Sequence, residues 1–431
     1  MRILKGLLIC VFLFSAVFFT FANGSQESSG ETAENEPVKL RFTVWSGNPD
    51  HLATLNGIAD SYREDHPNVE IAFDTIPFSE YVTKLTLQLS GSNPPDGGWL
   101  LETSAPTFID SGVLAEVGDH IKSIEEYDYA DFSDPAMELW KQGDGLYGIP
   151  FSTSPFVMFY NEDLFRQAGV PTPPEAIENG NWTWENFAES ARAIKVETGK
   201  YAFQTFNGAG YDARLFHTIV PILRAYGVDM WNEEGELQLS TPEAYEALSL
   251  YHAMIFDDKT VEPPGTQADF FIGDAATTIS QISRVPKLSD ADFEWDIAPL
   301  PAGPAGRPWV IGQAAFAVFR ASKHPEVAKD FLAHLTNKEN VAKLAQFFPP
   351  ARVSVIESKA FVEANPGLTS DQMEIVQQGI KNGTVLPSHV NFPKISMEAR
   401  GAFDSLWQAD ADVKATLNEI NKQLKPLVET D

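Results

Sequence analysis

Cysteine is almost absent from this sequence. Cys10 is the only cysteine among 431 residues, and it lies in the first apolar stretch of the chain. Disulfides, thiol catalysis and cysteine-ligated metals are therefore excluded for the rest of the chain. The 8 histidines show no metal-binding spacing, and no His-Glu-x-x-His, Gly-x-Ser-x-Gly or Walker sequence occurs. We therefore expect no metal, no cofactor and no catalytic residues.

Basic residues are also scarce. The chain has 31 Lys and Arg against 60 Asp and Glu, which gives a formal net charge of −29. Such a surface repels phosphate backbones and anionic lipids, so nucleic acid is excluded as a partner. Apolar residues make up 43% of the chain, and the length fits two to three domains with sizeable cores.

Long apolar runs are absent except at the beginning of the chain. Arg2 and Lys5 precede the apolar stretch Leu7–Phe19, and Thr20-Phe21-Ala22 offers small residues at the −3 and −1 positions. This pattern is typical of a secretory signal peptide over residues 1–22, cleaved after Ala22. A membrane anchor that is retained is the alternative interpretation.

The residues around Cys10 do not form a lipobox, because Ile9 is not small and cleavage there would leave an apolar tail. Residues 23–37 are polar and rich in Ser, Glu and Gly, which predicts a flexible leader between the cleavage site and the fold. The signal predicts export to the periplasm.

Strand and helix patterns alternate after the leader. Residues 38–45 alternate as a strand, a helical stretch covers 52–66, residues 69–73 form a second strand pattern, and 78–89 form a second helix pattern. This alternation implies a parallel sheet covered by helices. Such sheets bind ligands at the carboxyl ends of their strands, and Trp45 lies at one of these ends.

The same patterns continue along the chain. They predict strands at 156–160, 275–282, 296–299 and 314–319, helices at 162–168, 184–195, 243–256, 325–335 and 341–347, and mostly helix beyond residue 351.

Two short motifs do not support the functions that they formally match. Gly143–Gly148 fits Gly-x-Gly-x-x-Gly, but Ile149-Pro150 follows at once, so no helix is available to bind a pyrophosphate, and a turn is the better interpretation. Asp290–Asp296 resembles the start of a calcium loop, but Trp295 stands where the loop needs glycine.

Several segments, all in the same order, carry a family resemblance. They are Phe42–Trp45 (FTVW), His66–Ile71 (HPNVEI), Pro95-Asp96, Gly145–Pro150 (GLYGIP), Tyr160–Gly169 (YNEDLFRQAG), Phe271–Ala276 (FIGDAA), Pro299–Pro301 (PLP) and Pro349–Arg352 (PPAR). By these segments the chain resembles family 1 of the extracellular solute-binding proteins, the sugar-binding group of ABC importers that includes maltose-binding protein. The resemblance spans almost the whole chain after the leader.

The resemblance implies an α/β fold of the periplasmic-binding-protein type II, with two α/β lobes, a hinge and an interlobe cleft. It implies an N-terminal lobe of residues 38–149 plus 300–348 and a C-terminal lobe of residues 150–299 plus 349–431. The chain would cross between them near Ile149-Pro150, Pro299–Pro301 and Pro349-Pro350, where proline favours an extended chain. The implied function is that of a monomeric periplasmic protein that captures a sugar by lobe closure and delivers it to the membrane subunits of an ABC permease.

A sugar presents apolar C–H faces and a belt of hydroxyls, which aromatic rings and polar side chains respectively suit. Residue type, place at strand ends and the resemblance together select the candidates. The residues that we expect to contact the ligand are Trp45, Ser46, Asn48, Tyr81, Trp99, Glu102, Thr103, Ser152, Ser154, Phe206, Asn207, Tyr211, Trp231, Gln281, Arg284, Trp309, Gly312 and Arg352. At the position of Ser154 the maltose-binding relative has an acid, which predicts a ligand other than maltose.

Two other functions remain open at this point. A secreted glycosidase would need two carboxylates flanking the ligand, and Glu102 is the one acid that we place in the cleft. The other is a binder of a different ligand, such as a polyol, a glycerol phosphate or a peptide. A phosphodiester ligand would need several cationic contacts, and only Arg284 and Arg352 are obvious. An uncharged sugar is therefore favoured.

Overall fold

The computed structural model describes residues 37–205, 215–232, 234–266 and 268–429. The predicted signal peptide and nearly all of the predicted leader lie outside the described residues. No helix of the described residues has the length and apolar character needed to cross a membrane.

The larger of the two main sheets has six strands. Its order is β12-β11-β3-β1-β2, and β6 pairs with β11 outside this path. The strands are β1 (Val38–Val44), β2 (Val69–Thr75), β3 (Gly97–Leu101), β6 (Ile149–Pro155), β11 (Val310–Val318) and β12 (Thr384–Val385). The parallel strands β1, β2 and β3 follow from the strand and helix alternation of the sequence, whereas β11 runs antiparallel to both β3 and β6.

Helices cover this sheet because each buries one apolar face against it. Leu55, Ile58 and Tyr62 are the buried face of the first helix, and Phe331, Leu332 and Leu335 are that of a later one. The elements that accompany the sheet are α1 (Pro49–Asp65), η1 (Phe78–Glu80), α2 (Tyr81–Leu89), α3 (Ala105–Asp110), α4 (Gly118–Ser123), η2 (Glu125–Tyr127), η3 (Tyr129–Asp131), α5 (Asp134–Glu138), α11 (Pro325–Thr336) and α12 (Lys338–Leu344).

The smaller sheet has the strand order β10-β7-β9-β8. Its strands are β7 (Val157–Asn161), β8 (Tyr201–Gln204), β9 (Ala275–Ser280) and β10 (Trp295–Ala298). The helical elements that follow these strands in the chain are α6 (Glu162–Ala168), α7 (Pro173–Glu178), α8 (Trp184–Thr198), α9 (Leu215–Ala225), α10 (Pro242–Phe256), η5 (Phe270–Ile272) and η6 (Ile282–Leu288). Every residue of β7 is buried, as the continuous apolar run of the sequence predicts.

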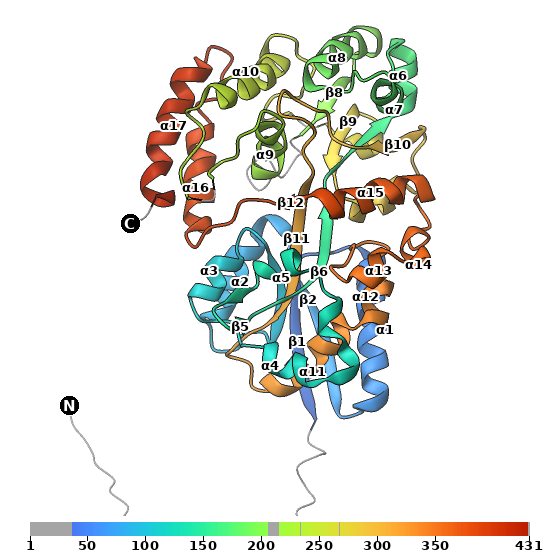
Figure 1. Ribbon diagram of the computed structural model, residues 1–431, viewed down its shortest axis with the longest axis vertical. Coiled ribbons are helices and arrows are strands. Elements are labelled where there is room, and N and C mark those ends of the chain that lie inside the picture. The colour runs from blue at the N-terminus through green and yellow to red at the C-terminus, as the bar shows by residue number, and fades with distance from the viewer. Residues whose placement is uncertain (1–36, 206–214, 233, 267, 430–431) are drawn as a thin grey trace, which may run out of the picture. The chain divides into compact units, whose positions relative to one another are not determined.

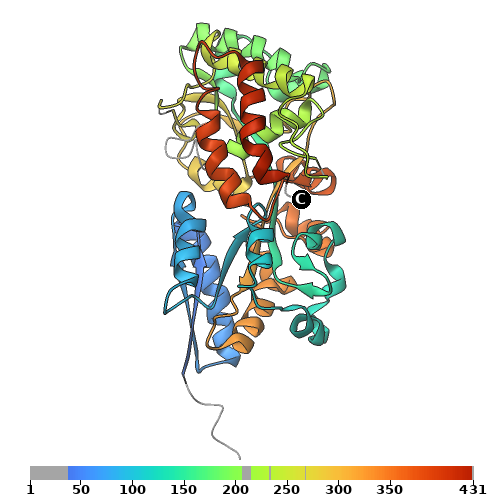
Figure 2. The same cartoon turned by 90° about the vertical axis from the view of Figure 1, so that its left-hand side faces the viewer.

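The C-terminal part of the chain is mostly helical, as expected from its sequence. It contains α13 (Val353–Ile356), α14 (Lys359–Val362), α15 (Ser370–Asn382), α16 (Phe392–Phe403) and α17 (Val413–Val428). The helices α16 and α17 lie side by side near the smaller sheet, which both views show (Figure 1 and Figure 2). Residues Met373 and Val376 of α15 pack in one apolar cluster with Val157 and Phe159 of β7.

Two separate apolar cores divide the chain into two α/β lobes, and β6 and β11 run from one to the other (Figure 1). Phe151 of β6 belongs to the core of the larger sheet, whereas Phe156, directly after β6, belongs to the core of the smaller sheet. On β11, Val310 belongs to the core of the smaller sheet and Ala314 to the core of the larger sheet. These two strands are therefore chain crossings between the lobes.

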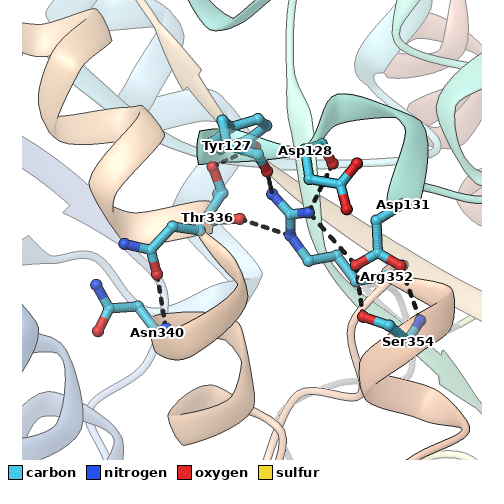
Figure 3. A network of polar contacts seen from close by, with 8 residues as sticks. Tyr127, Asp128, Asp131, Thr336, Asn340, Arg352 and Ser354 are labelled. Atoms are coloured by element: carbon cyan, nitrogen blue, oxygen red, sulfur yellow. Dashed lines mark hydrogen bonds and ion pairs between the residues drawn. The ribbon is translucent and has the colours of Figure 1, made fainter. Parts of the chain in front are cut away.

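A third connection is held by Arg352, which lies just before α13 and is fully buried (Figure 3). Its guanidinium donates to the carbonyl oxygens of Tyr127 (2.8 Å), Asp128 (3.0 Å) and Thr336 (3.1 Å) and lies 3.5 Å from the Asp131 carboxylate. The prediction that Arg352 contacts the ligand is therefore wrong, because its guanidinium is buried and its donors contact three backbone carbonyls and the Asp131 carboxylate. Arg352 instead ties the chain after Pro350 to that lobe.

Several element boundaries differ from the sequence predictions. The first helix starts at Pro49 rather than at residue 52, because the Asn48 side chain accepts from Asp50 N and caps it. The predicted helix at 78–89 begins with the 3-10 turn η1, and β11 begins at Val310 rather than at residue 314. Gly143 lies in the turn between the short strands β4 (Lys141–Gln142) and β5 (Gly145–Leu146), so the Gly-rich segment is a hairpin turn, as predicted.

Candidate ligand-binding cleft

A cavity of about 440 Å³ lies between residues of both lobes. Its volume falls within the ~300–1,000 Å³ typical of small-molecule sites. The residues that line it are Trp45, Ser46, Gly47, Asn48, Pro49, His51, Phe78, Leu101, Glu102, Phe151, Ser152, Ser154, His217, Gln281, Ser283, Arg284, Lys287, Gly312, Gln313, Ala314 and Phe348. Nine of them belong to the set expected from the sequence, namely Trp45, Ser46, Asn48, Glu102, Ser152, Ser154, Gln281, Arg284 and Gly312.

The sheet topology brings these residues together. The strands β1 and β3 are parallel neighbours, so the loop after Val44 and the residues after Leu101 emerge at the same edge of the sheet. The strands β6 and β11 are antiparallel, and their register places Ser154 opposite Gly312. Segments near residues 45–51, 101–102, 151–154 and 312–314, which are far apart in the sequence, thus line the same cavity.

Glu102 is the buried acid of the cavity, with 1% of its surface exposed. Its Oε2 accepts from Gln313 N at 2.9 Å, whereas Oε1 has no hydrogen-bond partner among the described residues. Burial raises the pKa of Glu102 to about 8. At neutral pH the carboxyl is therefore mainly protonated and can donate a hydrogen bond as well as accept one.

Ser154 gives the cavity a second unpartnered polar atom. Only 2% of the residue is exposed, and its Oγ has no hydrogen-bond partner among the residues that the structure describes. Its carbonyl oxygen is used, because it accepts from Gln281 Nε2 at 2.9 Å. Because a buried unpaired hydroxyl costs about 1–3 kcal/mol, Ser154 Oγ is a candidate contact for a ligand hydroxyl.

The raised pKa of Glu102 predicts a pH dependence of stability. In the unfolded chain the carboxyl ionises near its ordinary pKa of ~4.3, so between that pH and about 8 unfolding releases a proton, and stability falls as the pH rises. Urea unfolding of the wild type should lose about 1–2 kcal/mol from this group between pH 6.5 and 8, because one proton contributes ~1.4 kcal/mol per pH unit. Glu102→Gln is expected to remove this loss.

The comparison of variants isolates Glu102 from His51, whose pKa burial lowers to about 4. His51 is neutral in the folded protein over this range and titrates only in the unfolded chain, equally in every variant. Glu64→Gln on the exposed face of α1 is the matched control, and it should keep the wild-type slope. If Glu102→Gln and Glu64→Gln lose stability in parallel with the wild type over this range, Glu102 is ionised in the folded protein.

Trp45 supplies a half-buried aromatic ring to the cavity. Its ring meets those of Trp99 (4.7 Å between centroids), Tyr81 (5.1 Å) and Phe78 (6.1 Å) edge-on. Tyr81 and Trp99 are buried behind it in the core, and Tyr81 Oη donates to Thr43 O at 2.9 Å. The prediction that Tyr81 and Trp99 contact the ligand is corrected, because both side chains are buried in the core and neither lines the cavity.

The loop after β1 is held by a local hydrogen-bond network. Ser46 Oγ lies 2.7 Å from His51 Nδ1 and accepts from Asn48 N at 3.2 Å. The His51 ring packs against Phe347 and Phe348, with centroids 4.5 and 4.8 Å apart. The loop therefore presents a fixed polar surface to the cavity.

The second lobe closes the cavity with Gln281 and the 3-10 helix η6. The Gln281 amide lies directly over Gly312, where a Cβ would come within 2.5 Å of Gln281 Nε2 and within 3.3 Å of Phe156 Cζ. Glycine at position 312 thus permits the close approach of this amide. Arg284 and Lys287 of η6 line the same side.

Other predicted site residues lie elsewhere. Thr103 lines a neighbouring cavity of about 550 Å³, which shares Phe78, Leu101 and His217 with the first. Trp231 is buried in the core of the smaller sheet, with its ring 5.9 Å from that of Phe216, and this corrects its expected role.

Trp309 is half-buried beside Gly379 of α15 and does not line the 440 Å³ cavity. Phe206, Asn207 and Tyr211 lie outside the described residues.

The sequence reasoning missed several lining residues, among them His51, Phe78, Phe151, His217, Lys287 and Phe348. His51 had a usable signal, because Asn48-Pro49 is a helix-start pattern that places His51 in the first turn, beside the ligand loop. Phe348 had no such signal in the sequence, because only the fold brings residue 348 next to residue 51. No group of three or more His, Cys, Asp or Glu that could hold a metal ion occurs within the described part of the chain.

Two α/β lobes joined by strand crossings, with a cavity at the strand ends between them, define a two-lobed solute-binding protein of the type II periplasmic fold. The chain belongs to the bacterial extracellular solute-binding protein family, which matches residues 46–342. Its role is therefore to bind a solute, as the resemblance in the sequence predicted, and the members of this family are binding proteins rather than enzymes.

Individual relatives are similar over most of their length. The arabinooligosaccharide-binding protein of Halalkalibacterium halodurans is 28% identical over 351 residues, 76% of this chain and 74% of the relative. An ABC substrate-binding protein of Listeria monocytogenes, solved in complex with cycloalternan, has a TM-score of 0.78 at 22% identity and covers 90% of this chain and 98% of its own. UgpB of Mycobacterium tuberculosis, in complex with glycerophosphocholine, has a TM-score of 0.77 at 21% identity and covers 92% of this chain and 99% of its own.

Proposed function

We propose that this protein captures a sugar, either a monosaccharide or an oligosaccharide, as the periplasmic substrate-binding component of an ABC importer. The relative in Halalkalibacterium halodurans is named for an arabinooligosaccharide, and the Listeria structure holds cycloalternan. The protein acts as a monomer, hands its ligand to the permease subunits and has no catalytic activity of its own.

The observation that carries this proposal is the pair of unpartnered atoms, Glu102 Oε1 and Ser154 Oγ, in a cavity that also contains the Trp45 ring. A sugar hydroxyl can both donate and accept, so it can satisfy either atom. The ring of Trp45 suits an apolar C–H face. A buried polar atom without a hydrogen-bond partner costs free energy, and a ligand hydroxyl can supply that partner.

Ligand capture by lobe closure follows from the crossings. We propose lobes of residues 38–149 plus 300–348 and of residues 150–299 plus 349–431, joined near Ile149-Pro150, Pro299–Pro301 and Pro349-Pro350. The two apolar cores support a division into two lobes, and the changes of core fall between Phe151 and Phe156 and between Val310 and Ala314, somewhat later in the chain than Pro150 and Pro301. A hinge of this kind lets two rigid bodies close over a ligand and exclude water.

Export to the periplasm completes the proposal. The signal peptide over residues 1–22 would be cleaved after Ala22, and residues 23–37 would link the new N-terminus to β1. N-terminal sequencing of the exported protein should begin at Asn23, whereas a sequence that begins at Met1 would indicate a retained anchor.

A secreted glycosidase is less well supported by the cavity. Hydrolysis of a glycoside needs two carboxylates on either side of the scissile bond. Among the described lining residues, Glu102 is the only acid. The geometry thus favours a binding protein.

A thermal-shift screen of mono- and oligosaccharides, with product analysis of each mixture, tests the proposed function. For a ligand with a Kd of ~1 μM, which equals about −8 kcal/mol, a 100-fold excess over Kd adds about 2.7 kcal/mol of stability. A sugar that raises the unfolding temperature and is recovered intact supports the proposal. Release of smaller sugars would support a glycosidase, and no shift with any sugar would contradict a sugar-binding function.

Ser154→Ala separates binding from folding. Because Ser154 Oγ has no partner in the described structure, its removal should change the free energy of unfolding by less than about 1 kcal/mol or should stabilise the protein. Affinity for the best sugar should fall roughly 5–15-fold, the equivalent of one hydrogen bond. Calorimetric titration measures this loss, and Ser111→Ala, whose Oγ donates to Phe108 O outside the cavity, is the control. An unchanged affinity would remove Ser154 from the site.

A further inference from the structure

The wall formed by η6 gives the cavity a positive charge. Arg284 and Lys287 both line it, and Glu102, on the opposite lobe, is the single acid among the described lining residues. Burial raises the pKa of that acid and lowers the pKa of His51, so both are mainly neutral at pH 7. These two cations lie at one wall of the cavity in a chain whose formal net charge is −29.

Arg284 is half-buried and lacks a counter-charge in contact. Within the described residues its guanidinium forms no hydrogen bond or ion pair. Its Cζ lies over the Phe271 ring, 5.8 Å from the ring centroid. Asp269 acts on it only at a distance. Arg224 differs, because its guanidinium pairs with Asp229 at 2.6 Å and donates to Val385 O at 2.7 Å.

A partly desolvated guanidinium is costly when no anion or set of acceptors satisfies it. A neutral hydroxyl accepts one hydrogen bond, whereas a carboxylate, sulfate or phosphate accepts two parallel ones from the guanidinium fork and supplies the missing charge. The surface charge of this protein repels anions in general, so an anionic ligand would need local cations of this kind.

We propose that the ligand is a sugar that carries an anionic oxyacid group, and that Arg284 binds this group while Glu102 and Ser154 bind hydroxyls on the opposite side of the cavity. This proposal rests on the proposed sugar-binding function and narrows it. Lys287 adds positive charge at the same wall. An uncharged sugar, which the sequence favoured, would leave Arg284 without a counter-charge.

Calorimetric titration with matched pairs of ligands tests the proposal. The probes are glucuronate against glucose, digalacturonate against galactobiose, and glucose 6-phosphate as the phosphate arm. At least one acidic sugar should bind roughly 10–100-fold more tightly than its neutral counterpart, as expected for hydrogen bonds to a charged group. Its affinity should fall when NaCl is raised from 0.05 to 0.5 M, because salt screens the charges.

Variants locate the effect. Arg284→Gln should remove most of the preference for the acidic sugar and leave the affinity for the neutral one within a few-fold, whereas Arg284→Lys should keep part of the preference. Lys359→Gln, at a side chain that is 87% exposed, is the control and should change nothing.

The outcomes are distinguishable. If a neutral sugar binds as tightly as its acidic counterpart, or if Arg284→Gln leaves the ratio of the two affinities unchanged, the proposal that the ligand carries an anionic group is refuted. The sugar-binding function then still stands. If glycerol phosphate binds but no sugar does, both proposals fail. A preference for glucose 6-phosphate over the uronates would identify the oxyanion as a phosphate, and the reverse would identify it as a carboxylate.

Discussion

Replacing Arg352 with methionine is expected to lower the free energy of unfolding by about 3–5 kcal/mol, the cost of removing one partner from a buried charged network. Arg352 is fully buried and stacks on the rings of Tyr127 (4.5 Å) and Phe132 (4.2 Å). Methionine fills part of the volume but leaves three carbonyl oxygens without this donor and removes the positive charge beside the Asp131 carboxylate, which keeps its hydrogen bonds from Ser354 (Figure 3).

Urea unfolding of the ligand-free protein measures this effect. The control is Arg63→Met, because the Arg63 side chain is 52% exposed and pairs with Asp60 on the surface of α1, so the change should stay within about 0.5 kcal/mol. Ligand affinity at a temperature where both variants are folded should be unchanged, since Arg352 lies outside the cavity. An Arg352→Met variant as stable as Arg63→Met would show that the network contributes little.

Replacing Trp45 with leucine is expected to weaken ligand binding by about 2–3 kcal/mol, roughly 30-fold or more, as for buried tryptophans at binding hot spots. Leucine preserves an apolar surface but removes the flat ring on which a sugar face can lie. The ring orientation is held by Tyr81 and Trp99, which the substitution does not touch. Calorimetric titration with the best sugar of the screen measures the loss.

Two further variants show whether the ring itself matters. Trp45→Phe retains a smaller ring and should lose less affinity than Trp45→Leu. Trp309→Leu changes another half-buried tryptophan, which does not line the cavity, and should leave affinity within about 2-fold of the wild type. An effect of Trp309→Leu equal to that of Trp45→Leu would mean that both act through stability or that the ligand lies elsewhere.

Local pattern was enough to predict most of the elements. The alternation in residues 38–45 predicts β1, because period two is the signature of a half-buried strand, and the continuous apolar run at 156–160 predicts the fully buried β7. The pattern placed the start of α1 too late, because Asn48 was assigned to a ligand loop although it also caps the helix, which begins at Pro49. The strand β11 pairs antiparallel with β3, more than 200 residues away in the chain, and parallel with β12, and no local pattern records either pairing.

The site was predictable where chain position determines it and unpredictable where packing does. Trp45 and Glu102 follow directly after parallel strands, so topology alone puts them at the ligand edge. Ser154 and Gly312 came from the family resemblance. Trp231 and Arg352 are residue types that bind ligands as readily as they fill cores, and only the positions of Phe216 and of the Thr336 carbonyl decide between the two.

A crystal structure of the protein with the tightest ligand of the sugar screen tests the central claim most directly. The account predicts a ligand in the 440 Å³ cavity, with hydroxyls within about 3.2 Å of Glu102 Oε1 and Ser154 Oγ and one face against the Trp45 ring. A ligand bound at another surface, or one in the cavity that leaves both of these oxygens unpaired, would contradict it.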